Sequence, residues 1–506
     1  MAASCGTSPA REFALTQPAT LPELQAHYGP HYRWLLLLAV MIGTMAAIMS
    51  STIINVAVPD MSRHFALGQE RAQWVASGFM LAMTVSMLTT PWLLERYGYR
   101  RTYAGTMWVL LAGSIVGGLS NDFSLVLAAR VAEGLAAGVV QPIPAIIILR
   151  AFEPHEQGRA GGIFGMGVVL APAIGPSVGG LLVDWFGWRS IFFMVLPFCL
   201  ASLWLAQRFV PTIPAGGTAA RRPGGKLDWP GLLWASAGTL CLLNGLVQLH
   251  AGLSPLTLLL LGGALVALAG FMARQRRLGR AMTPGGNAPL LNLALYQHRA
   301  FAMGSIVAFI YGMALFGSTY LLPVYMRLAL VLSASHIGTI LLPAGLVLAV
   351  TIPLVGRLSD RQPTYLLVSI GLALLASSFA LMATIGLASS LWLLMAWAIL
   401  GRIGLGFILP SLNSGSLRGL RHDLIPQGSS AINFVRTLGG AAGVSVCGIV
   451  LEWRLAAHGD ALANPASSPA RLAAFNESFY LLAALCALAL AAAWRLRPSP
   501  PRPHGE

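Results

Sequence analysis

The sequence predicts an all-α protein that crosses a membrane many times. Of its 506 residues, 56% are hydrophobic and only 10% are charged, whereas a soluble protein of this size carries about 25% charged residues. Apolar runs of about 20 residues, each long enough to cross a bilayer as a helix, recur along the whole chain. Backbone groups that face lipid have no water to pair with, so a segment of this kind must satisfy them within its own helix.

We expect fourteen such helices in two bundles. The expected spans are 34–57, 72–93, 103–120, 124–149, 161–182, 190–209, 229–249, 255–273, 301–325, 336–355, 364–386, 391–413, 428–451 and 475–494. The expected organisation is a cytoplasmic tail (1–32), a six-helix bundle (33–209), a linker (210–228), an inserted two-helix hairpin (229–273), a second linker (274–300), a second six-helix bundle (301–494) and a cytoplasmic tail (495–506).

Loop charge predicts the orientation of the spans. The net charge is +15, and most basic residues lie in loops that would share one side of the membrane. Cytoplasmic loops carry an excess of Lys and Arg, so both termini are expected in the cytoplasm. A basic helix face or tail is missing, which argues against nucleic-acid binding. The opposite side would hold only Arg63, Arg71, Arg189, Arg327, Arg454 and Arg471.

An internal repeat supports the division into two bundles. Glu95 and Arg96 follow the second expected span, and Asp360 and Arg361 follow the tenth. Two similar halves in parallel orientation are typical of many secondary transporters, whose substrate site lies between the halves near the middle of the membrane. The spacing of the repeat leaves two extra spans between the halves, which we interpret as the hairpin.

Five short motifs lie in order along the chain. They occupy 52–59, 91–101, 175–180, 227–231 and 433–440. With these motifs the chain resembles the fourteen-helix drug:proton antiporter branch of the major facilitator superfamily (EmrB/QacA-like multidrug exporters). The resemblance implies a proton-coupled exporter of small amphipathic compounds in a bacterial inner membrane. It would work by alternating access, with the proton gradient as its energy source and no cofactor.

Two of these motifs are expected to control conformation. The loop motif and its repeat would form a charge latch. The alternative is that these charges only fix the orientation of a hairpin in the membrane. The motif in the fifth span would form a gating helix, because glycines three to four residues apart allow close helix approach and proline favours a kink. Structural packing alone is the alternative. The latch residues are Glu95, Arg96, Gly98, Arg100, Arg101, Asp360 and Arg361, and the gating residues are Gly175, Pro176, Gly179 and Gly180.

One carboxylate lies deep within a span. Glu133 follows Arg130 by three residues, so both share one helix face, and charges within a membrane are costly and usually functional. In the family that the chain resembles, an Arg in this helix is thought to serve proton transfer, and a Gln usually stands where Glu133 does. We expect Glu133 and Arg130 to couple transport to protons; a static pair that braces the bundle is the alternative.

A second departure concerns the first span. The family usually has an Asp two residues before Thr52, where this chain has Ser50. Either Glu133 has taken over the coupling, or the protein is not driven by protons in the usual way.

The cavity between the bundles is expected to be amphipathic and net positive. Inside the spans, Arg130, Arg402 and Arg436 are opposed by a single carboxylate, that of Glu133. This excess of positive charge favours neutral, zwitterionic or weakly acidic substrates over lipophilic cations. Aromatic residues near span ends are also common interfacial anchors. The expected cavity residues are Asn55, Trp74, Gln141, Tyr311, Phe316, Asn433, Arg436 and Arg402.

The sequence leaves one rival open. A dedicated exporter of one metabolite, such as a siderophore or an antibiotic, would use the same fold, and the sequence does not separate it from a broad exporter. Other functions fit less well. A membrane enzyme would need an intramembrane cluster of His, Asp or Glu or a metal-ligand spacing, so no catalytic residue, cofactor or metal site is expected. A receptor would need a sizeable soluble domain. A periplasmic adaptor with an outer-membrane channel is a partner of some exporters in this branch; the outer loop at 452–474 leaves it open without indicating it.

Overall fold

The computed structural model describes residues 20–212, 226–249, 252–281, 289–386, 389–460 and 468–497. Within these ranges the ordered elements are all helices. Thirteen helical stretches within them, with 71–97 and 123–151 each counted as one, are long and apolar enough to cross a membrane. The all-α membrane fold is therefore confirmed. The expected fifth span lies within the 30-residue helix α8 (Gln157–Phe186). Some side chains of α8 lie outside the described residues, and the count of fourteen spans stays a prediction.

The N-terminal half is built around α2. This helix packs on α8 and α9, while α3 packs on α6, and α5 packs on both α6 and α9. The elements of this part of the chain are α1 (Leu21–Tyr28), α2 (Tyr32–His64), α3 (Gln69–Ser86), the 3-10 turn η1 (Met87–Thr89), α4 (Thr90–Tyr97), α5 (Tyr99–Leu119), α6 (Phe123–Val140), α7 (Ile143–Ala151), α8 and α9 (Ser190–Phe209).

The C-terminal half is built around the pair α12 and α16. These two helices pack along each other, α14 packs on α15 and α17, and α13 packs on α15. The elements are the 3-10 turn η3 (Leu293–Gln297), α12 (Arg299–Leu328), α13 (Ala334–Ser359), α14 (Thr364–Met382), α15 (Leu391–Leu417), α16 (Ile425–Ala457) and α17 (Pro469–Trp494).

Two apolar runs of the N-terminal half are broken helices. The expected span 72–93 is divided by η1, and the expected span 124–149 is divided by a turn at Gln141 and Pro142. Proline lacks the N–H that would continue a helix, and one stands at each break: Pro91 in the first turn of α4 and Pro142 at the start of α7. The hydroxyl of Thr90 donates to the carbonyl of Val139 at 3.1 Å and thereby joins the two breaks.

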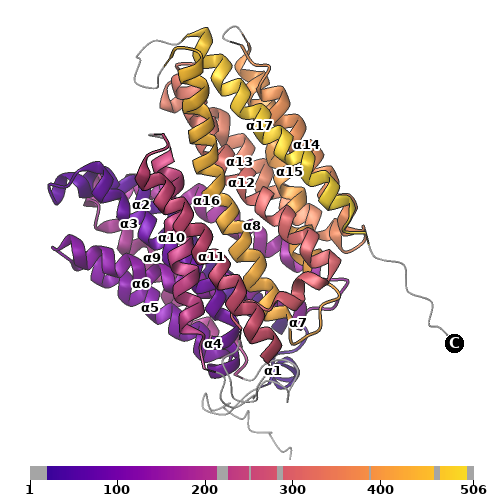
Figure 1. Cartoon of the computed structure of the whole chain (residues 1–506). Helices are drawn as coiled ribbons and strands as arrows, with labels where there is room; N and C mark the ends of the chain where they lie inside the picture. The colour runs from indigo at the N-terminus through magenta and orange to yellow at the C-terminus, as the bar shows by residue number, and fades with distance from the viewer. Residues whose placement is uncertain are drawn as a thin grey trace, which may run out of the picture.

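The two halves meet at one end of the molecule. We call this end, which carries Arg96, Arg159 and Arg418, the inner end, because the positive-inside rule predicts that it faces the cytoplasm. Figure 1 shows the halves converging at their lower, inner end and spreading apart above it. The contacts between the halves come from α3, η1, α4, α7 and α8 on one side and from α13, α15 and α16 on the other. The structure is therefore closed toward the inner side.

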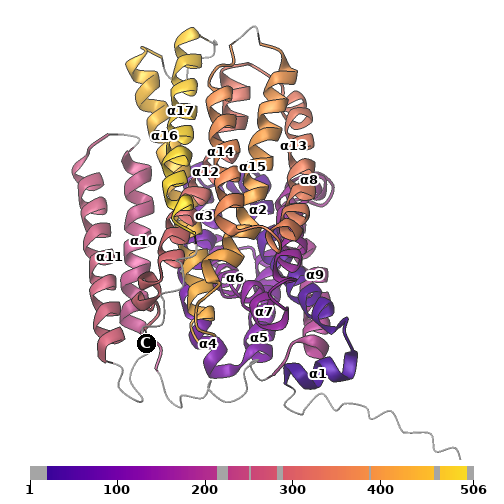
Figure 2. The same cartoon turned by 90° about the vertical axis from the view of Figure 1, so that its right-hand side faces the viewer.

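A hairpin of α10 (Trp229–Gln248) and α11 (Pro255–Ala281) stands beside the halves (Figure 2). Its second helix extends beyond the expected limit at residue 273. Besides α11, α10 packs on α3 of the N-terminal half and on α16 of the C-terminal half. The hairpin thus covers one seam between the two halves, whereas many large side chains of α11, such as Leu259 and Leu265, are exposed and face the region that lipid would occupy.

A polar cluster at the inner end holds the hairpin together. The fully buried carboxylate of Asp228 accepts hydrogen bonds from Arg274 Nε at 2.6 Å, Gln275 Nε2 at 2.9 Å and Gly231 N at 3.1 Å. Gln275 Oε1 in turn accepts from the backbone N–H of Leu291 at 3.3 Å, in the segment that leads into α12. Asp228 therefore caps α10 and links both hairpin helices to the C-terminal half.

We expect Asp228→Ala to lower the free energy of unfolding by about 2 kcal/mol, because it removes a helix cap and leaves donors without their acceptor. The measurement is the apparent melting temperature of purified protein, followed by tryptophan fluorescence. Asp423→Ala is the matched control, since the Asp423–Arg421 pair is exposed and exposed pairs contribute little. Equal melting temperatures for the two variants would contradict the role assigned to Asp228.

Candidate functional site

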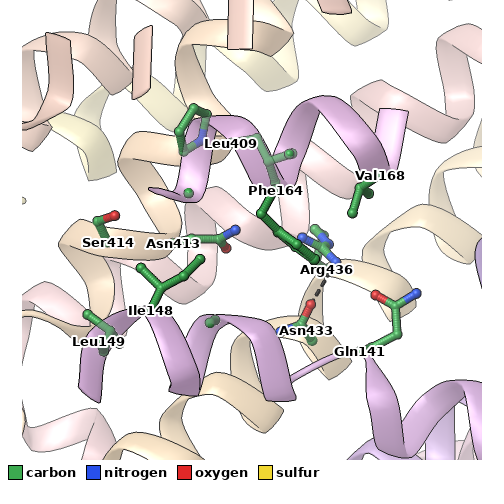
Figure 3. Close-up of a pocket in the computed structure, with 14 residues that line it drawn as sticks. Gln141, Ile148, Leu149, Phe164, Val168, Leu409, Asn413, Ser414, Asn433 and Arg436 are labelled. Atoms are coloured by element: carbon green, nitrogen blue, oxygen red, sulfur yellow. Dashed lines mark hydrogen bonds between the residues drawn. The ribbon is translucent and has the colours of Figure 1, made fainter. Parts of the chain in front are cut away.

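A cavity lies between the halves, toward the inner end (Figure 3). Its walls come from α7, α8 and the turn before α7 on one side and from α15 and α16 on the other. It encloses about 40 Å³, room for a few water molecules but far below the roughly 300–1,000 Å³ of a drug-sized site. A substrate therefore fits only if the halves move apart here. The lining residues are Gln141, Ala145, Ile148, Leu149, Gly161, Phe164, Gly165, Val168, Leu409, Pro410, Asn413, Ser414, Asn433 and Arg436.

The cavity combines an apolar wall with a few polar groups. Arg436 Nη2 donates to Asn433 Oδ1 at 2.7 Å, and the amide of Asn433 donates to the carbonyl of Ser429 at 2.9 Å. Gln141 faces this pair from the N-terminal half, and Phe164 lies above it (Figure 3). Such a lining can hold an amphipathic molecule, with hydrogen bonds that orient its polar part.

Some of the expected cavity residues lie elsewhere. Gln141, Asn433 and Arg436 are in the lining. Tyr311 is buried within electrostatic range of Arg402 and Arg436, so this group adjoins the cavity. The lining does not include Asn55, Trp74 or Phe316: the first two are exposed, and the ring of Phe316 packs against Gly440.

The expected pair of Arg130 and Glu133 is present and fully buried. Arg130 Nη1 lies 2.5 Å from Glu133 Oε2. The hydroxyl of Ser114 donates to Glu133 Oε1 at 2.7 Å, and that of Ser50 donates to Oε2 at 3.1 Å. A side chain at Gly113 would place its Cβ 2.7 Å from Glu133 Cγ, so α5 makes room for the carboxylate with a glycine.

Ser50 also serves Arg130. Its hydroxyl accepts from Arg130 Nη1 at 2.7 Å, and its carbonyl accepts from Nη2 at 3.1 Å. Arg130 Nε donates to the carbonyl of Val75 at 3.3 Å, and the guanidinium lies 4.2 Å from the centre of the Phe79 ring, a cation–π distance. The network joins α2, α3, α5 and α6 inside the N-terminal half. The sequence had shown Ser50 only as a missing carboxylate and had given no signal for Ser114.

Asp360 connects the two halves at the inner end. Its Oδ1 accepts from the backbone N–H of Gly158 at 2.6 Å, and its Oδ2 accepts from that of Arg159 at 2.8 Å. Both donors belong to the first turn of α8, where the helix dipole favours an anion. Arg418 Nη2 lies 4.0 Å from Asp360 Oδ1. Burial raises the pKa of the Asp360 carboxyl, and the two N–H groups and Arg418 oppose that shift.

The remaining expected latch residues make other contacts. Arg100 Nε donates to the carbonyl of Val210 at 2.8 Å, within the N-terminal half. Gly98 has φ 78°, and a Cβ there would lie 2.6 Å from the carbonyl oxygen of Thr212, which explains the need for glycine. Glu95, Arg96, Arg101 and Arg361 are exposed.

Further hydrogen bonds close the inner end. Arg150 Nη2 donates to the carbonyl of His422 at 2.9 Å, and the hydroxyl of Ser429 donates to the carbonyl of Pro142 at 2.9 Å. The latter bond uses the break between α6 and α7 as an acceptor. Both connect the N-terminal half to the segment that begins α16.

Helix α8 uses glycines on two stretches. Near its start, a Cβ on Gly158 or Gly162 would lie within 3.0 Å of atoms of α13, and one on Gly356 would lie 2.5 Å from the carbonyl oxygen of Gly158. Farther along, Gly175 and Gly179 face Thr52 and Ile53 of α2. The expected gating motif therefore packs on the N-terminal half. Gly180 makes no close contact, and the side chain of Pro176 lies outside the described residues.

The sequence matches the model of the Major Facilitator Superfamily over residues 40–444. The chain belongs to this superfamily. It is 26% identical over 477 residues to the uncharacterised transporter YcnB of Bacillus subtilis, which covers 94% of this chain and 97% of the relative. The riboflavin transporter RibZ of Clostridioides difficile is 26% identical (90% and 96% covered), and lincomycin resistance protein LmrB of Bacillus subtilis is 25% identical (90% and 93% covered). The resemblance to drug exporters of this superfamily is thus confirmed.

A solved structure shares the fold. The human organic anion transporter MFSD10 superposes with a TM-score of 0.65 at 17% identity, over 92% of this chain and 100% of that one. At this identity the likeness establishes the major facilitator fold and nothing about substrates.

We expect Gly356→Ala to loosen the contact between α8 and α13. The new Cβ would lie 2.5 Å from the carbonyl oxygen of Gly158, and overpacking of this kind costs about 1–3 kcal/mol. Hydrogen exchange of the α8 segment 157–165 should therefore become roughly tenfold faster. Gly338→Ala, on the same helix with nothing within 4 Å of its Cβ, is the control and should leave this exchange unchanged. Identical exchange in both variants would show that the contact does not hold the inner end closed.

Proposed function

We propose that the protein is a secondary active exporter that exchanges protons for small amphipathic compounds across the bacterial inner membrane. The observation that carries this proposal is an amphipathic cavity between two helical halves that are joined at their inner end. The compounds that suit it are neutral, zwitterionic or weakly acidic, because Arg436 is the charged group in its lining.

Alternating access follows from the way the halves are joined. The bonds from Asp360 to the start of α8 and from Arg150 to the carbonyl of His422 are at the inner end, and they can break as a group if the halves rock. Hydrogen bonds of this kind, in which one partner is charged, are each worth only a few kcal/mol. Substrate entering from the cytoplasm would have to displace these contacts, and the closed state of the structure would follow its release outside.

Proton coupling is assigned to Glu133. The carboxylate is completely buried and contacts one cation and two hydroxyls. Protonation would remove the charge that Arg130 needs, and leaving a buried charge unpaired is strongly unfavourable. Because Ser50, Ser114, Val75 and Glu133 belong to four different helices, a rearrangement of Arg130 would move helices rather than a single side chain. A static ion pair would show none of this linkage.

A second candidate is export of a single metabolite. RibZ, named a riboflavin transporter, and LmrB, named for lincomycin resistance, are similar to this chain over about the same length. The same fold therefore accompanies a vitamin transporter and a drug-resistance protein. A panel of riboflavin, lincomycin and other small compounds in one transport assay separates a broad exporter from a dedicated one.

We expect Glu133→Gln to abolish coupling while retaining substrate binding. Wild-type protein in proteoliposomes with an internal pH-sensitive dye should move protons when riboflavin or lincomycin is added, and the variant should move them at least about tenfold more slowly, because an amide cannot carry the proton. Binding and melting temperature, measured on the same preparations, establish that the variant is folded.

Glu153→Gln is the matched control, since Glu153 is exposed, and it should couple like the wild type. Normal coupling by Glu133→Gln would make the Arg130–Glu133 pair structural. If the wild type transports substrate without any proton movement, the proposed energy source is wrong.

A further inference from the structure

In the C-terminal half, a buried tyrosine lies near two arginines from two other helices, and one of these arginines lines the cavity. Tyr311 of α12 is 3% exposed and lies within electrostatic range of Arg402 of α15 and Arg436 of α16. The close approach of α12 and α16 explains the arrangement. A Cβ on Gly312 would lie 2.0 Å from the carbonyl oxygen of Arg436, so a glycine beside Tyr311 lets the two backbones touch at this level.

The two arginines lack a carboxylate partner in the part of the chain that the structure describes. Arg436 donates to the neutral amide of Asn433, and both arginines lie within electrostatic range of Tyr311. Among the described residues, the acidic residues of this half lie near helix ends or, in the case of Glu477, form an ion pair with Arg454. Glu452, on the same helix as Arg436, is sixteen residues farther along, or about 24 Å at the rise of an α-helix.

This situation differs from that of Arg130. There the guanidinium has Glu133 at 2.5 Å and four further contacts, so its charge is fully balanced within the protein. Two unbalanced guanidinium groups inside a membrane are costly and usually mark a ligand pathway. Guanidinium groups are well suited to carboxylates, because they offer several donors in one plane.

We propose that Arg436, Arg402 and Tyr311 bind the anionic group of the transported compound, and that the preferred substrates are amphipathic carboxylates. This inference rests on the exporter function proposed above and names its substrate class. The apolar body of the ligand would lie along Phe164, Val168 and Leu409, which line the cavity together with Arg436 (Figure 3). Like charges repel at short range in a medium of low dielectric constant, so the same pair disfavours cationic compounds.

Binding of three naphthalene probes that differ in the charge of their polar group tests the proposal. The probes are 2-naphthoate, neutral 2-naphthamide and a cationic naphthylmethyl-trimethylammonium, and the full chain is held in nanodiscs of zwitterionic phosphatidylcholine. Wild-type protein should bind naphthoate at least about tenfold more tightly than either of the others, as a charge-assisted contact would give. Arg436→Gln and Arg402→Gln should each reduce that preference to about threefold or less, whereas Arg436→Lys, which keeps the charge, should retain most of it.

Arg277→Gln is the matched control. It removes an exposed arginine of α11 and should preserve the preference for naphthoate. Equal binding of the three probes by the wild type, no binding of any of them, or an unchanged preference in both glutamine variants would overturn the proposal. A preference for naphthoate in a protein that moves no substrate would contradict the exporter function and leave the anion site standing. Proton-coupled efflux of lincomycin without any anion preference would support the exporter function and contradict the anion site.

Discussion

Close contact between helix backbones at glycine is the packing device on which the rest of this structure depends. In a bilayer the hydrophobic effect does not drive helices together, so association relies on van der Waals contact and interhelical hydrogen bonds. Here Gly134 and Gly138 let α6 touch the carbonyls of Phe79 and Met83 in α3, and Gly439 lets α16 touch the carbonyl of Phe309 in α12. A Cβ at any of these positions would come within 2.4 Å of another atom, so each contact requires the missing side chain.

The same device places the polar groups. Gly113 leaves the space in which the carboxylate of Glu133 reaches the hydroxyls of two other helices, and Gly312 brings Tyr311 beside Arg436. Gly158, on α8, and Gly356 let α8 approach α13 closely enough for Asp360 to bond the first N–H groups of α8. The charged and polar side chains within the membrane are therefore positioned by neighbouring glycines. A mutation at one of these glycines would displace the charge beside it while leaving every ionisable residue intact.

Much of the fold could be predicted from the sequence, because a span of lipid-exposed helix needs only length and apolarity. The breaks at Met87–Thr89 and after Val140 were not predicted, although Pro91 and Pro142 were visible signals; hydropathy averages over them. The pairing of Arg130 with Glu133 was predictable because it lies within one helix. The contributions of Ser50 and Ser114, and the bonding of Asp360 to α8, depend on which helices are neighbours, and a single sequence does not contain that information.

The two halves divide their charges in a way that suits exchange. The N-terminal half holds the ion pair of Arg130 and Glu133. The Glu133 carboxylate accepts hydrogen bonds from two hydroxyls and is not part of the cavity lining. The C-terminal half holds Arg436 in the cavity lining and Arg402 near Tyr311, and neither arginine has a carboxylate partner among the described residues. If the first site carries the proton and the second carries an anion, the two ligands never compete for the same groups. Coupling must then pass through movement of the halves, which meet where Asp360, Arg150 and Ser429 cross the interface. Such coupling requires that proton and substrate each favour a different arrangement of these contacts, so a variant that loosens the inner end should weaken coupling without altering either binding site.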